Sequence, residues 1–324
     1  MLRFLARRLA FSILLVAVVS SSGLILTRLA PGDITSEQVG TGVTAKSLEA
    51  ERARLGLGRP LLVQYGEWLG RAVRLDFGMS LMYGRPVGPL VAERAGNTAV
   101  LAFVALAVAT LIGLPLGVIA GSRRGAVSSA IRALSILMLS LPSLVSSLLL
   151  VFVAARTGWL PSGGMTSMAS SSPGWGEAMI DLLRHLVVPA AAIALPLAAT
   201  LERLQAQSTE ETMREPYVAA AYARGVSRRR VIWRSALKPA LRPVASIYGL
   251  ICGSLLSGSF VVEIVTAWPG LGRLMYDALR SRDLFLVAGC AAAGGVFLAL
   301  GSLASDLALA VLDPRLRIHV GRRA

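Results

Sequence analysis

The chain has few of the residues from which metal sites and catalytic sites are usually built. Among its 324 residues are two cysteines and two histidines. Cys252 and Cys290 stand far apart without spaced companions, which argues against a metal cluster or a disulfide framework and indicates two small buried thiols. His185 and His319 are equally isolated. The sequence therefore predicts no metal site.

Signatures of catalysis and of nucleotide binding are also missing. The chain contains neither Gly-x-Ser-x-Gly nor His-Glu-x-x-His, which mark two common classes of hydrolase. Its lysines, Lys46 and Lys238, do not stand in a Gly-x-x-x-x-Gly-Lys-Ser/Thr phosphate loop. We therefore expect no catalytic residue and no cofactor, and an ATP-driven function would require a partner that binds the nucleotide.

Charged residues are scarce, at 16% of the chain, while 55% of residues are hydrophobic and the mean hydropathy is +0.66. Soluble domains carry about 25% charged residues, so this composition predicts a polytopic membrane protein. The expected fold class is all-α with six transmembrane helices, each long enough to span a bilayer. Their predicted ranges are 9–30, 98–121, 132–156, 186–206, 243–265 and 284–312. The fourth is the weakest, because Pro189, Pro196, Glu202 and Arg203 interrupt or end it.

Arginine clusters predict the orientation, because loops rich in Lys and Arg stay in the cytoplasm. One cluster precedes the first span, a second follows the second span, a third lies between the fourth and fifth spans, and a fourth follows the sixth span. The first, second and fourth consist of Arg3, Arg7 and Arg8, of Arg123, Arg124 and Arg132, and of Arg315, Arg317, Arg322 and Arg323. With six spans all of them fall on one side, so both termini are expected in the cytoplasm. The long segment of mixed charge after the first span then faces outward.

This topology divides the chain into four parts. They are an N-terminal anchor helix (1–30), an outer, periplasmic-side loop region (31–97), a transmembrane domain (98–317) that contains the cytoplasmic loop 207–240, and a cytoplasmic tail (318–324). An alternative for the first part is a cleavable secretory signal that ends near the small residues 19–23. The apolar run resumes at residues 24–26, which favours a retained anchor.

The most informative segment is the basic stretch between the fourth and fifth spans, residues 207–240, which we call the coupling loop. Pro216 can begin a helix and Gly225 can end one, because glycine adopts the left-handed conformation without steric cost. These two residues predict a short helix over about 216–224. Ser227 is placed to cap a second helix, whose body at 231–237 is amphipathic.

Two kinds of surface could receive this loop. The first helix carries small residues that would let its backbone enter a groove of another protein, at Ala219, Ala220, Ala221 and Ala223. The second stretch, 228–238, is basic and includes Trp233, so it suits anionic lipid headgroups as well as protein. The net charge of +15 does not indicate nucleic acid, because the arginines lie at membrane ends and no recognised nucleic-acid motif accompanies them.

Six segments, in this order and spacing, resemble the permease subunits of a transporter family. They are Arg28-Leu-Ala-Pro-Gly-Asp33, Leu55-Gly-Leu-Gly-Arg-Pro-Leu-Leu-Val-Gln-Tyr65, Asp76-Phe-Gly-Met-Ser80 with Gly84-Arg-Pro-Val87, Gly158-Trp-Leu-Pro-Ser-Gly163, Trp268-Pro-Gly-Leu-Gly-Arg-Leu274 and Leu312-Asp-Pro-Arg-Leu-Arg317. Together they resemble the inner-membrane permeases of the dipeptide, oligopeptide and nickel importers of the ATP-binding cassette (ABC) class. The resemblance extends from the first residues to about 317.

This resemblance implies a multi-pass protein of the bacterial inner membrane that forms half of a pathway for peptides or for a related solute such as a nickel chelate. It further implies a second permease subunit, separate ATPase subunits and an extracytoplasmic solute-binding protein as partners. The coupling loop would then insert into the ATPase through Glu215, Tyr217, Ala219, Ala220, Ala221, Arg224, Gly225 and Ser227. Aligned on Gly225, the chain has Ala219 where the general importer pattern has glutamate, so a salt bridge from that position is missing.

Charged residues inside membrane spans are costly and are therefore functional candidates. Asp306 and Glu263 are the two that we single out. Asp306 lies within two turns of Asp313, which favours hydration at the cytoplasmic edge over a functional role, and Glu263 falls near the outer end of the fifth span, where the same two interpretations are open. Such residues would suit the alternative of a secondary transporter that works without an ATPase, but the chain shows no internal repeat. A receptor or scaffold is disfavoured because no sizeable soluble domain is expected.

Overall fold

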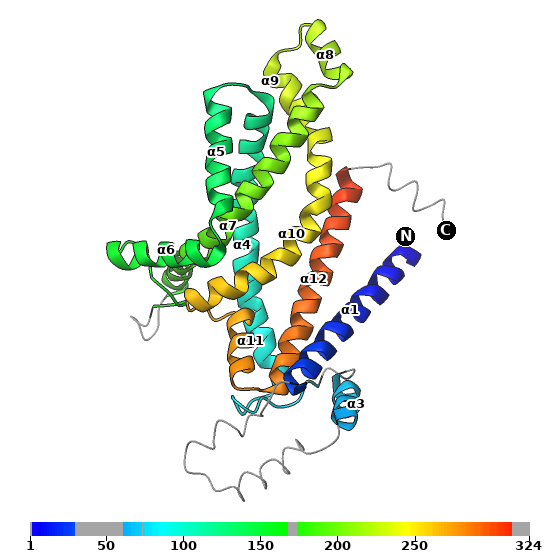
Figure 1. The fold of residues 1–324 in the computed structure, drawn as a ribbon, viewed down its shortest axis with the longest axis vertical. Coiled ribbons are helices and arrows are strands. Elements are labelled where there is room, and N and C mark those ends of the chain that lie inside the picture. Colours follow the sequence, from blue (N-terminus) through cyan, green and yellow to red (C-terminus); the bar gives the residue numbers. More distant parts are fainter. Residues whose placement is uncertain (1, 30–60, 73, 75, 168–173, 313–324) are drawn as a thin grey trace, which may run out of the picture. The chain divides into compact units, whose positions relative to one another are not determined.

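The computed structural model describes residues 2–29, 61–72, 74, 76–167 and 174–312 (Figure 1). Within these ranges the chain is helical apart from turns and one isolated antiparallel bridge between Met79 and Pro86. This confirms the predicted all-α class. The chain forms two compact units: unit 1 comprises Met1–Leu5, Ala99–Trp268 and Leu300–Ala324, and unit 2 comprises Ala6–Thr98 and Pro269–Ala299.

The helices follow one another with short connections. In chain order they are α1 (Leu2–Leu29), α3 (Leu61–Ala72), α4 (Val87–Ser122), α5 (Ala126–Ser140), α6 (Ser143–Thr157), α7 (Trp175–Met213), α8 (Pro216–Ala223), α9 (Arg228–Arg230), the π-helical turn η2 (Val231–Ala236), α10 (Leu237–Val265), α11 (Leu271–Arg280) and α12 (Leu284–Leu312).

Three of these helices are long and apolar enough to cross a membrane: α4, α7 and residues Leu284–Ser305 of α12. The pair α5 and α6 would make a fourth if it forms one bent span. Helices α1 and α10 lie where two more spans are predicted, but within the described residues they do not meet the same criteria of length and composition. The structure therefore supports a multi-pass membrane protein, and the number six stays a prediction.

The predicted span over 132–156 corresponds to two helices that are bent relative to each other. The helix stops at Ser140, and α5 and α6 meet at an angle of 97°. Pro142 explains the break, since proline has no N–H to donate and forces the preceding residue out of the helical region. Leu141 is accordingly extended, with φ −92° and ψ 110°.

Helix α7 also differs from its predicted form, because it is continuous where an interruption was expected. It spans 39 residues and contains Pro189 and Pro196 in its interior. Glu202 and Arg203 do not end it, since it continues to Met213. A helix of this length, at 1.5 Å per residue, reaches about 58 Å, which exceeds the hydrocarbon core of a bilayer of about 30 Å.

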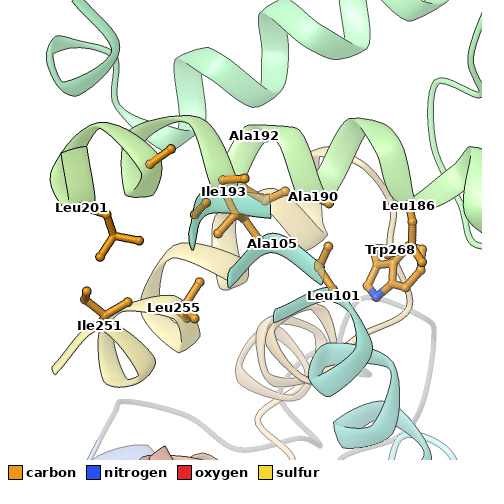
Figure 2. Close-up of a cluster of buried hydrophobic side chains, with 14 of the residues drawn as sticks. Leu101, Ala105, Leu186, Ala190, Ala192, Ile193, Leu201, Ile251, Leu255 and Trp268 are labelled. Carbon is orange, nitrogen blue, oxygen red and sulfur yellow. The ribbon is translucent and has the colours of Figure 1, made fainter. Parts of the chain in front are cut away.

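The core of unit 1 lies where α4, α7 and α10 meet. Figure 2 shows Leu101 and Ala105 of α4 beside Ile193 of α7, with Leu255 of α10 in the same cluster. Trp268, at the edge of this cluster, is also fully buried. The hydroxyl of Ser208 on α7 donates to the backbone oxygen of Ala240 on α10, at 2.8 Å, which fixes these two helices to each other away from the apolar cluster.

Three glycines bring α4 unusually close to α7. Gly113, Gly117 and Gly121 recur every four residues and so lie on one face of α4. A Cβ atom built at Gly113 would lie 2.5 Å from the backbone oxygen of Ala198, and one at Gly121 would lie 2.2 Å from that of Ala206. Real side chains do not approach so closely, and this spacing of small residues is the one that lets membrane helices pack backbone against backbone.

Unit 2 is organised around a buried carboxylate, that of Asp283, which precedes α12. Its oxygens accept hydrogen bonds from the Ser80 hydroxyl at 2.7 Å, from the Met82 amide at 3.1 Å and from the Leu286 amide at 3.2 Å. The segment 76–87 that resembles the transporter family therefore has a structural role here. A buried carboxylate is stable only when hydrogen bonds replace its hydration, and the loop around Ser80 supplies them.

We predict that Gly117→Ala destabilises the protein. A Cβ at position 117 would lie 2.6 Å from both the Gln205 Cβ and the Glu202 backbone oxygen, so α4 and α7 would have to separate. Overpacking of this kind costs about 1–3 kcal/mol. Thermal unfolding of the detergent-purified protein, followed by size-exclusion chromatography, measures the loss.

Gly96→Ala is the matched control in the same helix, since no atom lies within 4 Å of a Cβ built there. It should stabilise the helix by about 0.5–1 kcal/mol, because alanine restricts the unfolded chain more than glycine does. Equal melting temperatures for the two variants would contradict the close packing of α4 on α7.

Candidate functional site

The coupling loop begins with a well-defined short helix. Helix α8 spans Pro216–Ala223, with Pro216 in its first turn and Glu215 in an extended conformation just before it. The backbone oxygen of Glu215 accepts from the Val218 amide at 3.0 Å and so starts the helical hydrogen bonds. These observations confirm the predicted helix to within one residue and the role of Pro216 in beginning it.

The end of α8 depends on Gly225, whose φ is +73°. The Gly225 amide donates to Tyr222 at 2.9 Å, and the Val226 amide donates to Ala221 at 3.2 Å. This pair of bonds is the Schellman arrangement, in which the first residue past the helix is left-handed. Val226 and Ala221 also pack together, as that arrangement favours. The predicted left-handed turn at Gly225 is confirmed.

The second predicted helix is not a separate short element. Ser227 occupies the position before α9, but its hydroxyl makes no capping hydrogen bond, so the predicted side-chain cap is wrong. Helix α9 continues through η2 directly into α10, giving one helical segment from Arg228 to Val265. The π-helical turn at Val231–Ala236 widens this segment by one residue per turn, and such turns are rare outside functional regions.

Helix α8 has a buried face and an exposed face. Val218 and Ala221, at 1% and 4% exposure, pack against Val231 of η2, with Met213 and Val226 at the border of the cluster. This small apolar cluster joins the end of α7, helix α8 and the start of the long helical segment. A displacement of α8 must therefore move both neighbours or break the cluster.

The exposed face of α8 carries small residues between two tyrosines. Ala219 and Ala220 are exposed, whereas Ala221, which we also expected in a partner's groove, faces its own chain. Tyr217 and Tyr222 are 42% and 39% exposed. Partial burial, and next the carboxylate of Glu215, raise the pKa of the Tyr217 hydroxyl, so at neutral pH it is protonated and can donate a hydrogen bond.

The remaining predicted residues of the loop surround this face. Glu215, Arg224 and Ser227 are all exposed at the two ends of α8. The exposed surface thus offers one carboxylate, one guanidinium and a hydroxyl around the methyl groups of Ala219 and Ala220. Small side chains of this kind leave the helix backbone open to close approach.

A cavity of about 660 Å³ lies beside the loop at the turn between α4 and α5. It is lined by Gly121, Ser122, Arg123, Arg124, Gly125, Ser128, Ser129, Arg132, Glu210, Met213, Arg214 and Arg228. Arg228 donates to the backbone oxygen of Ser122 at 2.5 Å, which ties the start of α9 to the end of α4. From the sequence we expected Arg123, Arg124 and Arg132 only to set the orientation, because their convergence with Arg214 and Arg228 depends on the packing of three helices.

The intramembrane candidates have different surroundings. Glu263 is fully buried and lies two residues before the end of α10, at the helix end where the sequence placed it. Asp306 belongs to α12, but its side chain lies outside the described residues. The sequence overlooked Glu202 of α7, whose side chain is 1% exposed and whose two carboxylate oxygens have no hydrogen-bond partner among the described residues. Its position beside Arg203 had indicated a helix end.

Comparisons with known proteins match nearly the whole chain. Residues 113–318 match the family described as the binding-protein-dependent transport system inner membrane component, and residues 1–99 match the N-terminal part of such components. A Brucella suis protein provisionally named a peptide permease is 34% identical over 98% of this chain and 100% of its own length. The oligopeptide transport system permease protein AppB of Bacillus subtilis is 30% identical over 98% and 99% of the two chains.

A third relative, the oligopeptide transport system permease protein OppB of Mycobacterium bovis, is 32% identical over 98% of this chain and 100% of its own. Proteins of this group are membrane permease subunits and not enzymes, and the apolar helices agree with a membrane protein. The chain is therefore a member of the inner-membrane component family of binding-protein-dependent transport systems, among the peptide permeases of the ABC importers.

Proposed function

We propose that the chain is one of two permease subunits in an ATP-driven importer, and that its solute is a peptide. The relatives named peptide and oligopeptide permeases support the solute class, and a nickel chelate is the runner-up from the same transporter group. A separate solute-binding protein would deliver the peptide, and separate ATPase subunits would supply the energy. The exposed face of α8 is the observation that carries this proposal.

Helix α8 has the properties that a coupling element requires. It is anchored on one side by Val218 and Ala221, so it is held in one orientation against its own chain. On the other side Ala219 and Ala220 leave its backbone accessible. A partner can drive a conformational change only if it binds the two conformations with different affinities. A helix that the partner binds on one side and that is packed against its own chain on the other passes this difference in affinity on to the rest of the chain.

The transmission runs through two covalent connections. Only Arg214 and Glu215 separate α8 from α7, and the amides of both are bonded to the last turn of α7, at 3.1 Å and 3.2 Å. On its other side, α8 turns at Gly225 into the segment that becomes α10. Closure of the ATPase pair around α8 would therefore act on α7 and α10, two helices of the unit 1 core.

Orientation in the membrane gives the first test. We predict that the coupling loop and both termini face the cytoplasm and that the segment 61–97 faces outward. In a chain with Cys252→Ala and Cys290→Ala, an impermeant thiol reagent added to intact cells should label Val63→Cys, an exposed position of α3, and should not label Ser227→Cys. Labelling of position 227 with protection of position 63 would reverse the proposed topology.

Dependence on partners gives the second test. Proteoliposomes that contain this chain alone should neither hydrolyse ATP nor accumulate a labelled peptide, because the chain lacks a phosphate loop. Co-reconstitution with the second permease, the ATPases and the binding protein should restore both activities. Peptide uptake by the single chain, driven by a proton or sodium gradient, would instead establish a secondary transporter.

The left-handed turn at Gly225 gives the third test. A Cβ at this position would meet no atom within 4 Å, so the only obstacle to a side chain is the backbone conformation. Valine in that conformation costs about 1–2 kcal/mol, so Gly225→Val should weaken co-purification with the ATPase roughly five- to thirtyfold. Gly225→Asn is the matched control, because asparagine tolerates this conformation, and it should retain binding. Equal binding by both variants would show that the turn is unimportant.

The exposed methyl groups give the fourth test. Ala220→Glu should reduce ATPase binding and peptide uptake while leaving abundance in the membrane unchanged, because a long charged side chain would occupy space that the partner's groove needs. Ala220→Ser preserves the size of the residue and should have little effect. Arg229→Ala, an exposed change in α9, should also be mild. Normal uptake by Ala220→Glu would exclude this face as the docking surface.

A further inference from the structure

The cavity beside the coupling loop carries an excess of positive charge. Glu210 is the acidic residue among those that line it, and its carboxylate is already paired with Arg132 at 3.1 Å and with Arg214 at 2.7 Å. Arg123 and Arg124 have no acidic partner in the described part of the chain. Their charge is therefore left for a ligand or for solvent to balance.

Helix α5 adds uncharged donors to the same cavity. It begins at Ala126, after Gly125, and no side chain caps its first turn. The first amides of a helix have no partner within the helix, and together with the helix dipole they favour an anion. Ser129 also lines the cavity with an exposed side chain, whereas the hydroxyl of Ser128 is already used in a bond to the Ala120 oxygen at 2.7 Å.

This combination of donors fits a phosphate group better than a carboxylate. Guanidinium groups present several N–H donors in a plane, and the three or four oxygens of a phosphate can accept from more than one arginine at once. The cavity also lies at the end of α4, one of the helices long and apolar enough to span a membrane. Basic pockets between membrane helices on the cytoplasmic side are a type of site that binds phospholipid headgroups.

We propose that this cavity is a binding site for a phosphate-bearing anion, either the headgroup of an anionic phospholipid or a soluble phosphate compound. Arg123, Arg124 and the first turn of α5 hold the phosphate. Arg228, which joins the cavity to the start of α9, brings the occupied site into contact with the coupling loop. The proposal does not depend on the peptide or on the ATPase, because it follows from the charge and geometry of this chain.

Titration calorimetry on the full-length protein in a neutral detergent tests the site. The probes are dihexanoyl phosphatidylglycerol, dihexanoyl phosphatidylcholine and inorganic phosphate, each at constant ionic strength. Preferential binding of phosphatidylglycerol supports the lipid as the source, and binding of inorganic phosphate supports a soluble compound. The double variant Arg123→Gln, Arg124→Gln should raise the Kd of the bound probe about tenfold or more, since each arginine contributes about a factor of five.

The matched control is the double variant Arg229→Gln, Arg230→Gln, which removes the same charge from exposed neighbours that do not line the cavity. Its Kd should stay near that of the unmodified chain. If the first pair impairs membrane insertion, Ser129→Glu provides an independent test, because a carboxylate in the first turns of α5 favours the helix yet should repel the phosphate.

Two results would overturn the proposal. One is that none of the three probes binds, and the other is an equal loss of affinity in the two double variants, which would indicate nonspecific attraction to charge. In the first case, binding of a glutamate-rich peptide would assign the cavity to an acidic segment of a partner protein.

Discussion

The close contact between α4 and α7 is the constraint on which the rest of unit 1 depends. With Gly113, Gly117 and Gly121 on the facing surface, the two backbones approach until a single methyl group would overlap the α7 carbonyl oxygens. Water contributes no hydrophobic driving force between helices inside a bilayer, so packing of this closeness is the main source of cohesion there. It also fixes the register of α7 relative to α4, because the glycines fit only against the stretch from Ala198 to Thr209. A shift of one residue would place side chains where the glycines now permit contact.

The fixed register of α7 determines where the coupling loop lies. Helix α7 ends at Met213, and the two-residue connection that follows leaves α8 little freedom. The cluster of Val218, Ala221 and Val231 then holds α8 against the start of the long segment that ends at Val265. Fully buried apolar side chains contribute about 1.5–3 kcal/mol each, which is enough to keep so short a helix in one orientation although it would not be stable alone. Helix α8 is thus held in place because its inner face is packed, and not because of the residues that it exposes.

Local rules predicted the parts of the loop that depend on single residues. Pro216 begins α8 and Gly225 ends it because each imposes a backbone conformation whatever surrounds it. Pro142 acts by the same rule, so the sequence contains the signal for the break between α5 and α6. The continuous apolar run around it led to the prediction of a single span. Ser227 has the extended backbone of a residue that precedes a helix, but its hydroxyl makes no capping hydrogen bond, and the backbone conformation alone does not decide how that side chain is turned. The spacing of the glycines in α4 is visible in the sequence. The helix against which they pack is not, because the residues of α7 that they face, such as Gln205, are far away in the sequence.

The cavity of arginines and the exposed face of α8 share structural elements, which has a thermodynamic consequence. Arg214 follows the last residue of α7 and lines the cavity, and only Glu215 separates it from α8. Arg228 lines the cavity as well and begins the segment on which α8 packs. An anion held there by Arg123 and Arg124 would therefore lie next to both ends of the loop and restrain them. If a partner bound to α8 prefers one spacing of these ends, the two binding events change each other's affinity by the same factor, because coupling free energy is reciprocal. The arginines from which the orientation of the chain is predicted would thus, by their position, also connect an anion bound in the cavity to the loop.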